Sequence, residues 1–198
     1  MKKDNMIISL LVLVLIVSVV GVYSNFFMRP ANIPITGLAT TTNATSQVQV
    51  EYYLSISASS ELSDGIDFGT VTTLPSSNIN ATDNYNATNM TTLDIAVSQD
   101  SNTAVDFCIR ADGNLNTTGG AEILLANETW DDNTTNNLYW PALNQSASLT
   151  TSYVKGSTSV PIGGKNYYRF WLNVTSGVEA GLYNNTIYFK GVTAGNPC

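Results

Sequence analysis

Apolar and polar residues alternate in short runs along most of the chain, the pattern of half-buried antiparallel strands. In the longest run every second residue is apolar, from Val48 to Ile56. Further runs with the same period lie at 66–68, 93–97, 105–109, near Tyr153, at 168–174 and at 187–189. Clusters of Gly, Asn, Asp and Ser separate them, and no stretch beyond residue 30 keeps a helical period. The pattern predicts an all-β fold, a single antiparallel β-sandwich over residues 48–198.

The alternation also assigns each strand an inward and an outward face. In the run 167–175 the predicted inward residues are Tyr168, Phe170, Leu172 and Val174, and the predicted outward residues are Tyr167, Arg169, Trp171, Asn173 and Thr175. In the last run Ile187 and Phe189 point inward, which leaves Asn184 outside. Trp171 shares a face with Asn173, where its indole would pack against a sugar on that asparagine. An exposed or inter-sheet Trp without a sugar contact is the alternative.

One apolar segment precedes the strands. Residues 6–23 form an 18-residue stretch without a charge, about the shortest helix that crosses a ~30 Å hydrocarbon layer. Residues 1–27 are therefore predicted to be a transmembrane helix held in membrane lipid, with Lys2 and Lys3 keeping the N-terminus inside. Cleavage of a signal peptide after Ser24 is the alternative. Residues 28–47 contain two prolines and a Thr-rich run without apolar periodicity, which predicts a stalk.

Composition adds exclusions to this picture. The 198 residues include no histidine, only 12 % charged residues and a net charge of −7. Without histidine there is no Ser-His-Asp or Cys-His relay and no His-ligated zinc site. The pI near 4.3 and the lack of a Lys/Arg cluster argue against nucleic-acid binding. Polarity comes instead from 22 Asn and 43 Ser and Thr residues.

The Asn-rich regions contain ten Asn-x-Ser/Thr sequons, about twice the number expected from the composition. All of them lie C-terminal to the apolar segment: Asn43, Asn80, Asn86, Asn89, Asn116, Asn127, Asn133, Asn144, Asn173 and Asn184. Accidental matches in an Asn/Thr-rich surface are the alternative. The excess predicts N-linked glycans on a domain that lies outside the cell, at a cell surface, behind a single membrane pass.

Cys108 and Cys198 are the only thiols. Two cysteines outside the cell most often pair, and a bridge between these two would close a loop of about 91 residues. Two free thiols, or an intermolecular disulfide through Cys198, are the alternatives. A catalytic cysteine is not expected without a histidine base.

Other candidate chemistry is weaker. Residues 112–116 begin like a calcium loop, but Thr117 stands where glycine is required and no glutamate closes the loop, so no metal site is predicted. No two Asp or Glu residues are singled out by the sequence as a catalytic pair. We therefore predict no catalytic residues and no cofactor. Several aromatic residues would suit a sugar-binding platform, although large aromatics in a sandwich more often belong to the core: Trp130, Tyr139, Trp140, Tyr167 and Tyr168.

The segment 168–190, with its Ser-Gly turn and the step Ala180-Gly181-Leu182-Tyr183, resembles the last two strands of Ig-like sandwiches in archaeal surface proteins. The segments 65–70 and 104–109 resemble earlier strands of the same modules, so the resemblance covers about 48–192. It implies an Ig-like fold, a surface location and a tyrosine corner at Tyr183. An apolar helix before a glycosylated sandwich is also similar to archaeal type IV pilins and archaellins, but their processing site is absent before Met6.

Together these features predict a non-enzymatic, N-glycosylated structural or adhesion protein of the cell envelope. Two other functions are kept open. One is a filament subunit that self-associates through its N-terminal helix, and the other is a secreted carbohydrate-binding module that uses Trp130 or Trp140.

Overall fold

The computed structural model describes residues 11–18 and 47–198. Residues 11–18 are helical, with exposed side chains. Within these two ranges no helix has both the length and the apolar character needed to cross a membrane. Most of the predicted membrane segment 1–27 and stalk 28–47 lies outside the described residues, so both stay predictions.

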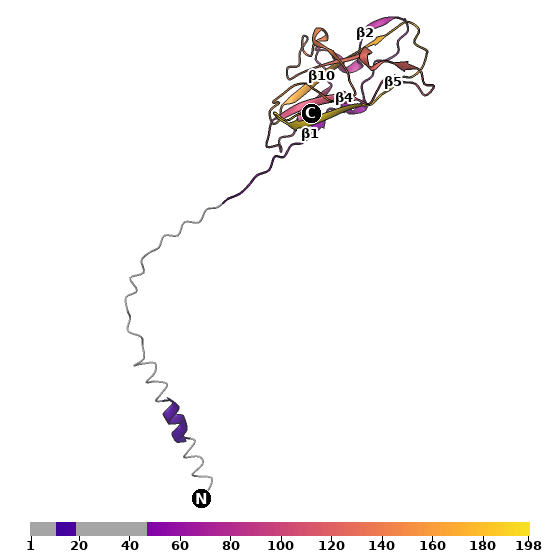
Figure 1. The fold of residues 1–198 in the computed structure, drawn as a ribbon. Coiled ribbons are helices and arrows are strands. Elements are labelled where there is room, and N and C mark those ends of the chain that lie inside the picture. Colours follow the sequence, from indigo (N-terminus) through magenta and orange to yellow (C-terminus); the bar gives the residue numbers. More distant parts are fainter. Residues whose placement is uncertain (1–10, 19–46) are drawn as a thin grey trace. The chain divides into compact units, whose positions relative to one another are not determined.

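Residues from Gln49 to Cys198 form one compact unit of mostly β structure, which confirms the all-β class (Figure 1). Its strands are β1 (Ile56–Ala58), β2 (Ser76–Asn80), β3 (Asp94–Val97), β4 (Val105–Ala111), β5 (Leu115–Asn116), β6 (Glu122–Ile123), β7 (Glu128–Asn133), β8 (Ala147–Ser148), β9 (Val154–Lys155), β10 (Lys165–Val174) and β11 (Ile187–Thr193). All strand pairs are antiparallel. The helical elements are short: α2 (Ser60–Asp64) and three 3-10 turns, η1 (Thr82–Asn84), η2 (Leu125–Asn127) and η3 (Leu143–Gln145).

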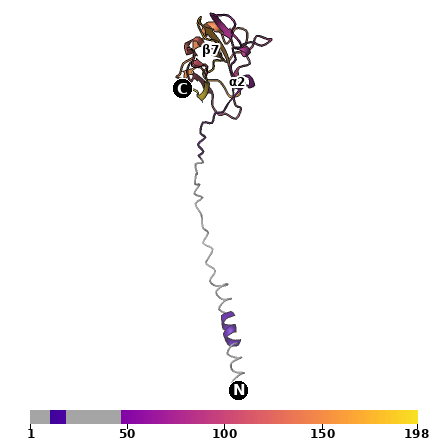
Figure 2. The ribbon, with the colours of Figure 1, turned by 90° about the vertical axis from the view of Figure 1, so that its right-hand side faces the viewer.

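Helix α2 lies at the edge of the domain, directly after β1 (Figure 2). Ser59 caps it, since its hydroxyl accepts a hydrogen bond from the N–H of Leu62 at 3.2 Å. Gly65, with φ near 115°, ends the helix in a conformation that residues with a side chain rarely adopt. The helix therefore turns the chain sharply and directs Leu62 into the core.

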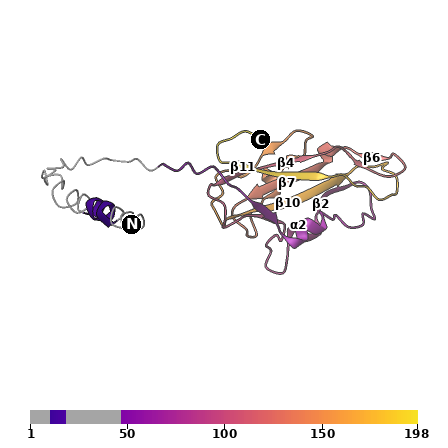
Figure 3. The same ribbon diagram turned by 90° about the horizontal axis from the view of Figure 1, so that it is seen from below.

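Strand β10 organises the larger sheet. Its order is β1-β3-β10-β7-β8, and β2 pairs with β10 beside β3. One edge of β10 thus serves two short strands, β3 and β2, while the other edge pairs with β7 from Tyr167 to Leu172. The second sheet has the order β11-β4-β9, and β5 pairs with β6 in a small ribbon (Figure 3).

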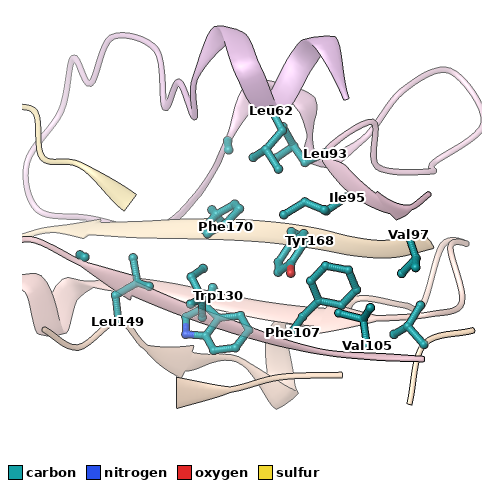
Figure 4. Packing of buried hydrophobic residues seen from close by; sticks show 14 of the residues in the cluster. Leu62, Leu93, Ile95, Val97, Val105, Phe107, Trp130, Leu149, Tyr168 and Phe170 are labelled. Carbon is teal, nitrogen blue, oxygen red and sulfur yellow. The ribbon is translucent and has the colours of Figure 1, made fainter. Parts of the chain in front are cut away.

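The two larger sheets share one hydrophobic core, an arrangement consistent with a β-sandwich. Figure 4 shows side chains from β3, β4, β7 and β10 gathered in this core, with Tyr168 near its centre. The Tyr168 ring lies 5.1 Å from the Phe189 ring and 6.5 Å from the Trp130 ring, between centroids. Aromatic side chains thus carry much of the packing between the sheets.

The predicted strands are confirmed where a partner strand exists, at 93–97, 105–109, 168–174 and 187–189. The predicted strand at 48–57 is largely wrong, because only its end forms β1 and the apolar side chains of Val48, Val50 and Tyr52 are 87 %, 75 % and 79 % exposed. The run 66–68 forms no strand. Its apolar residues Ile66 and Phe68 are half-buried and pack against the core from a loop.

The predicted outward face of β10 is also wrong at two positions. Arg169 is 0 % exposed and Trp171 is 1 % exposed, as deeply buried as the inward residue Phe170. The alternation rule assumes that one face of a strand meets water, but loops cover the second face of β10. Trp171 therefore has no exposed face to offer a sugar on Asn173. The assignments on β11 are confirmed, with Tyr188 and Lys190 exposed between half-buried Ile187 and Phe189.

Candidate functional site

The sequon asparagines lie on the accessible surface of the domain. Six of the nine described ones are exposed and three are half-buried, and Asn43 lies outside the described residues. The exposed ones are Asn80, Asn86, Asn89, Asn116, Asn144 and Asn184, and the half-buried ones are Asn127, Asn133 and Asn173. Access to water is the first requirement for attaching a glycan, and these nine positions meet it.

Local turns leave the amide nitrogen of some of these asparagines available for attachment of a sugar. In two sequons the asparagine Oδ1 accepts the N–H of the threonine two residues later, Asn86 from Thr88 at 2.9 Å and Asn133 from Thr135 at 2.8 Å. Such Asx turns use the oxygen and leave the amide nitrogen, the atom that would carry a sugar, outside the turn's hydrogen bond. Asn116 differs, because its Nδ2 donates to the carbonyl of Asn114 at 2.7 Å.

Buried Arg169 holds two loops against the sheet, one of which carries the sequons at Asn86 and Asn89. Its guanidinium donates five hydrogen bonds of 2.7 to 3.3 Å, all to backbone carbonyls, which accounts for all five of its N–H groups. The acceptors are Asn84, Asn89, Leu138, Pro141 and Asn137. The Tyr85 ring stacks on the same guanidinium, 4.2 Å from its carbon to the ring centroid. The loops at 84–90 and 137–141 are thus fixed by one side chain of β10.

Cys108 and Cys198 form a disulfide bond, the pairing that the sequence favours. Cys108 lies in the middle of β4, so the bond joins the C-terminal residues to the second sheet. Two lysines support this attachment, because the Nζ of Lys190 donates to the carbonyl of Cys198 and that of Lys155 donates to the carbonyl of Asn196, each at 2.6 Å.

Lys155 also contacts the buried carboxylate of Asp106 at 2.8 Å. Burial opposes ionisation of this carboxyl. The hydrogen bonds from Lys155 and from the N–H groups of Ser159 and Gly195 outweigh burial, and the pKa of Asp106 is lowered. Asp106 therefore stays charged at neutral pH and holds the segments around Ser159 and Gly195 next to β4.

One concave feature of the described domain is an apolar groove of about 720 Å³ near the start of β11. The loop 65–72 forms one wall, the segment 178–187 forms another, and the end of β10 and the β5-β6 ribbon supply the rest. The second wall is held by Tyr183, whose hydroxyl donates to the carbonyl of Glu179 at 2.8 Å. This bond has the form of a tyrosine corner, in which a tyrosine hydroxyl binds the backbone a few residues upstream.

Glu128, at the start of β7, is the buried carboxyl group of the groove. It is 1 % exposed, and its Oε2 accepts a hydrogen bond from the Nδ2 of Asn185 at 2.8 Å. Burial raises its pKa from 4.5 to about 7, helped by the negative charge of Asp112 and opposed by Asn185. Around pH 7 this group exchanges between an acid that donates a hydrogen bond and a carboxylate that accepts one. Asp67 and Glu179 also line the groove, at exposed positions.

The aromatic platform considered from the sequence does not assemble. Trp130 is 5 % exposed and Tyr168 is 1 % exposed, so both belong to the core, whereas Tyr139 and Trp140 are 72 % and 39 % exposed on a loop. In the segment 112–116, which begins like a calcium loop, Asp112 makes an internal hydrogen bond: its Oδ1 accepts the N–H of Thr186. Across residues 11–18 and 47–198 no group of three or more acidic, Cys or His side chains is arranged to hold a metal ion.

The sequence did not indicate the groove, Glu128 or the role of Arg169. The only available signal for Arg169 was a lone cation in an otherwise apolar and aromatic strand, and Glu128 had none. No protein-family model, no curated protein and no solved structure matches the chain. The resemblance to archaeal surface proteins therefore stays a prediction from short motifs.

Proposed function

We propose that the chain is a non-enzymatic, N-glycosylated structural or adhesion protein of a cell surface. In this proposal an Ig-like β-sandwich is displayed outside the membrane, and residues 1–27 anchor it in lipid with the N-terminus inside. The observation that carries the proposal is the placement of the sequons. None of the nine described sequon asparagines is buried.

The asparagines outside the sequons supply an internal comparison. Asn84 and Asn166 are 0 % exposed, and neither begins a sequon. Sequons that arose by accident from an Asn- and Thr-rich composition would have no reason to avoid such positions. Avoidance of the interior is expected where sugars are attached.

The sequons are also spread over many elements of the domain rather than gathered in one element. They occur at the ends of β2 and β7, on β5 and β10, in the turns η2 and η3, and in the loops after η1 and before β11. Glycans at these places would cover several loops and strand ends. A coat of this kind supports a role that depends on display and protection rather than on access to a catalytic cleft.

The disulfide supports the same location, because structural disulfides persist in oxidising compartments outside the cytosol. The absence of histidine from the sequence supports a non-enzymatic role, because it removes histidine-based nucleophile relays and His-ligated metal sites. A secreted carbohydrate-binding module is less well supported, because Trp130 is in the core.

The proposal is tested on protein purified from the native host. The protein should be recovered in the membrane fraction. N-terminal sequencing should find an uncleaved N-terminus, and the intact mass should exceed that of the polypeptide. Asn86→Gln and Thr88→Ala should each remove the same single glycan, whereas the matched control Ala87→Ser keeps the sequon and the glycan. An unmodified polypeptide mass, or recovery in the cytosol, would contradict the proposal.

A further inference from the structure

Strand β11 has one unpaired edge. It pairs with β4 along its full length, from Ile187 to Thr193. Within the part of the chain that the structure describes, no strand pairs with its other edge. An open edge of this kind presents backbone N–H and C=O groups to an added strand.

The interior of the domain opens along this same edge. Ile187 and Phe189 line the apolar groove and are only half-buried, whereas Phe107 and Ile109 on the neighbouring strand β4 are each 1 % exposed. Ile66 and Phe68 line the groove from the loop that follows α2. The groove therefore combines an unpaired backbone with an apolar trough, which are the two features that bind an extended, alternating peptide.

The chain itself carries a segment of that kind. Residues 47–53 alternate polar residues with Val48, Val50 and Tyr52, whose side chains are 75 to 87 % exposed. The segment has strand-like periodicity but no strand partner in the structure. Asn102 fixes its C-terminal part, since its Nδ2 donates to the carbonyl of Glu51 at 2.8 Å and its N–H donates to that of Tyr53.

Residues 49–53 of the segment and the groove lie at opposite ends of the domain. Ile56 of β1 is next to Gly191 of β11, because a Cβ built on Gly191 would lie 3.2 Å from the Ile56 side chain. Toward the C-terminus, the chain continues from Ile56 through α2 to the groove. Toward the N-terminus, it leads to the contact with Asn102 and then to the exposed segment. Figures 1 and 3 show residues 49–55, which directly precede β1, at one end of the domain and the β5-β6 ribbon, whose Ile123 lines the groove, at the other. The segment therefore points away from its own groove.

From this geometry we infer that residues 47–53 of one copy add as a strand to the open edge of β11 in a second copy. Val48, Val50 and Tyr52 fill the apolar groove, and Gln47, Gln49 and Glu51 face water. The donor and acceptor surfaces differ and lie at opposite ends, so the contact is head-to-tail and can repeat from copy to copy. This assembly uses the domain rather than the N-terminal helix, and a glycan on Asn184, which lines the groove, would compete with it.

The test places the photoreactive residue benzoylphenylalanine at position 52 of the full-length chain, purified in detergent. After irradiation, denaturing gels should show covalent dimers, and mass spectrometry should map the cross-links to residues 66–74 or 178–189. The double variant Val48→Asp/Val50→Asp should reduce the dimer yield at least tenfold. The matched control Gln47→Asp/Gln49→Asp adds the same charges on the alternate face and should keep most of the yield.

Other outcomes would overturn the inference. These are cross-links confined to monomers both in the wild-type sequence and with Asn184→Gln, cross-links that map away from the groove, or equal loss of dimers in both double variants. Native mass spectrometry that finds a small apolar molecule in the groove of a chain without cross-links would also overturn it. The measurement is repeated with Asn184→Gln, because Asn184 lines the groove and a glycan there would narrow it. Absence of dimers in this background as well is decisive against strand addition.

Discussion

Removal of the Arg169 guanidinium is expected to destabilise the domain more than any other single change to a charged residue. Arg169→Met keeps the length and apolar stem of the side chain but leaves five backbone carbonyls without their buried donor. A hydrogen bond to a charged group contributes roughly 1.5 to 3 kcal/mol, so simple addition over five bonds would exceed the total stability of many domains. Simple addition is therefore not the right measure.

Two effects reduce the cost. Burying a guanidinium carries a desolvation penalty of several kcal/mol, which the methionine variant avoids. The loops at 84–90 and 137–141 can also separate from β10 and expose some of the five carbonyls to water. Each carbonyl that stays buried without a donor costs about 1 to 3 kcal/mol, and with only some of the five left buried we expect a total loss of about 3 to 5 kcal/mol.

The loss is measured by equilibrium unfolding in urea, followed through tryptophan fluorescence. Arg110→Met is the matched control. Arg110 is half-buried, stacks on the Tyr188 ring at 4.1 Å and makes one backbone hydrogen bond, so its loss should cost about 1 kcal/mol. Hydrogen exchange should also speed up at 84–90 and 137–141 in Arg169→Met but not in the control. A loss below about 1 kcal/mol for Arg169→Met would refute this explanation of the loop structure.

Three further predictions concern stability. Cys198→Ser should lower the free energy of unfolding by about 4 to 5 kcal/mol in the chain-entropy model, measured under non-reducing conditions, and equal stabilities would show that the bond does not constrain the unfolded chain. Because burial raises the pKa of Glu128 from 4.5 to about 7, the folded state keeps a proton that the unfolded state loses over that interval, and stability falls as pH rises through it. Glu128→Gln should remove this fall and be up to about 3 kcal/mol more stable than the wild type at pH 8, with little difference at pH 4, whereas parallel pH profiles would contradict the assignment. Tyr183→Phe should cost about 1 kcal/mol in thermal or urea unfolding, from loss of the bond to Glu179, and an unchanged midpoint would show that this bond is not needed.

Alternation predicted strands where the alternating residues meet a partner strand. The runs in β4 and β11 satisfy this condition, since they pair with each other over seven residues. The run 48–55 has equally good periodicity but no partner, and periodicity alone does not reveal whether one exists. Strand β7 was missed for the opposite reason, because its consecutive acids Asp131 and Asp132 hide the period although the strand is paired along its length.

The candidate sites divide in a similar way. The sequons and the cysteines are local signals, and their exposure and pairing follow from the sequence with few assumptions. The partners of Arg169 are backbone carbonyls from two distant loops, and a backbone carbonyl leaves no mark on the sequence. The burial of Glu128 likewise depends on the β11 segment closing over β7 from nearly sixty residues away. Contacts of this kind require the tertiary structure.

The central place of β10 has a consequence for the order of folding. It pairs with β2, β3 and β7, all of which precede it in the chain, and only β11 among the described strands follows it. During synthesis from the N-terminus, three partner strands are therefore made before the strand that joins them. The larger sheet cannot close until residues 165–174 have emerged, and its edges stay open to other chains during that interval. Under the proposed function, glycans added early at Asn80 and Asn133, at the ends of β2 and β7, would shield these two strands while the chain is still being made.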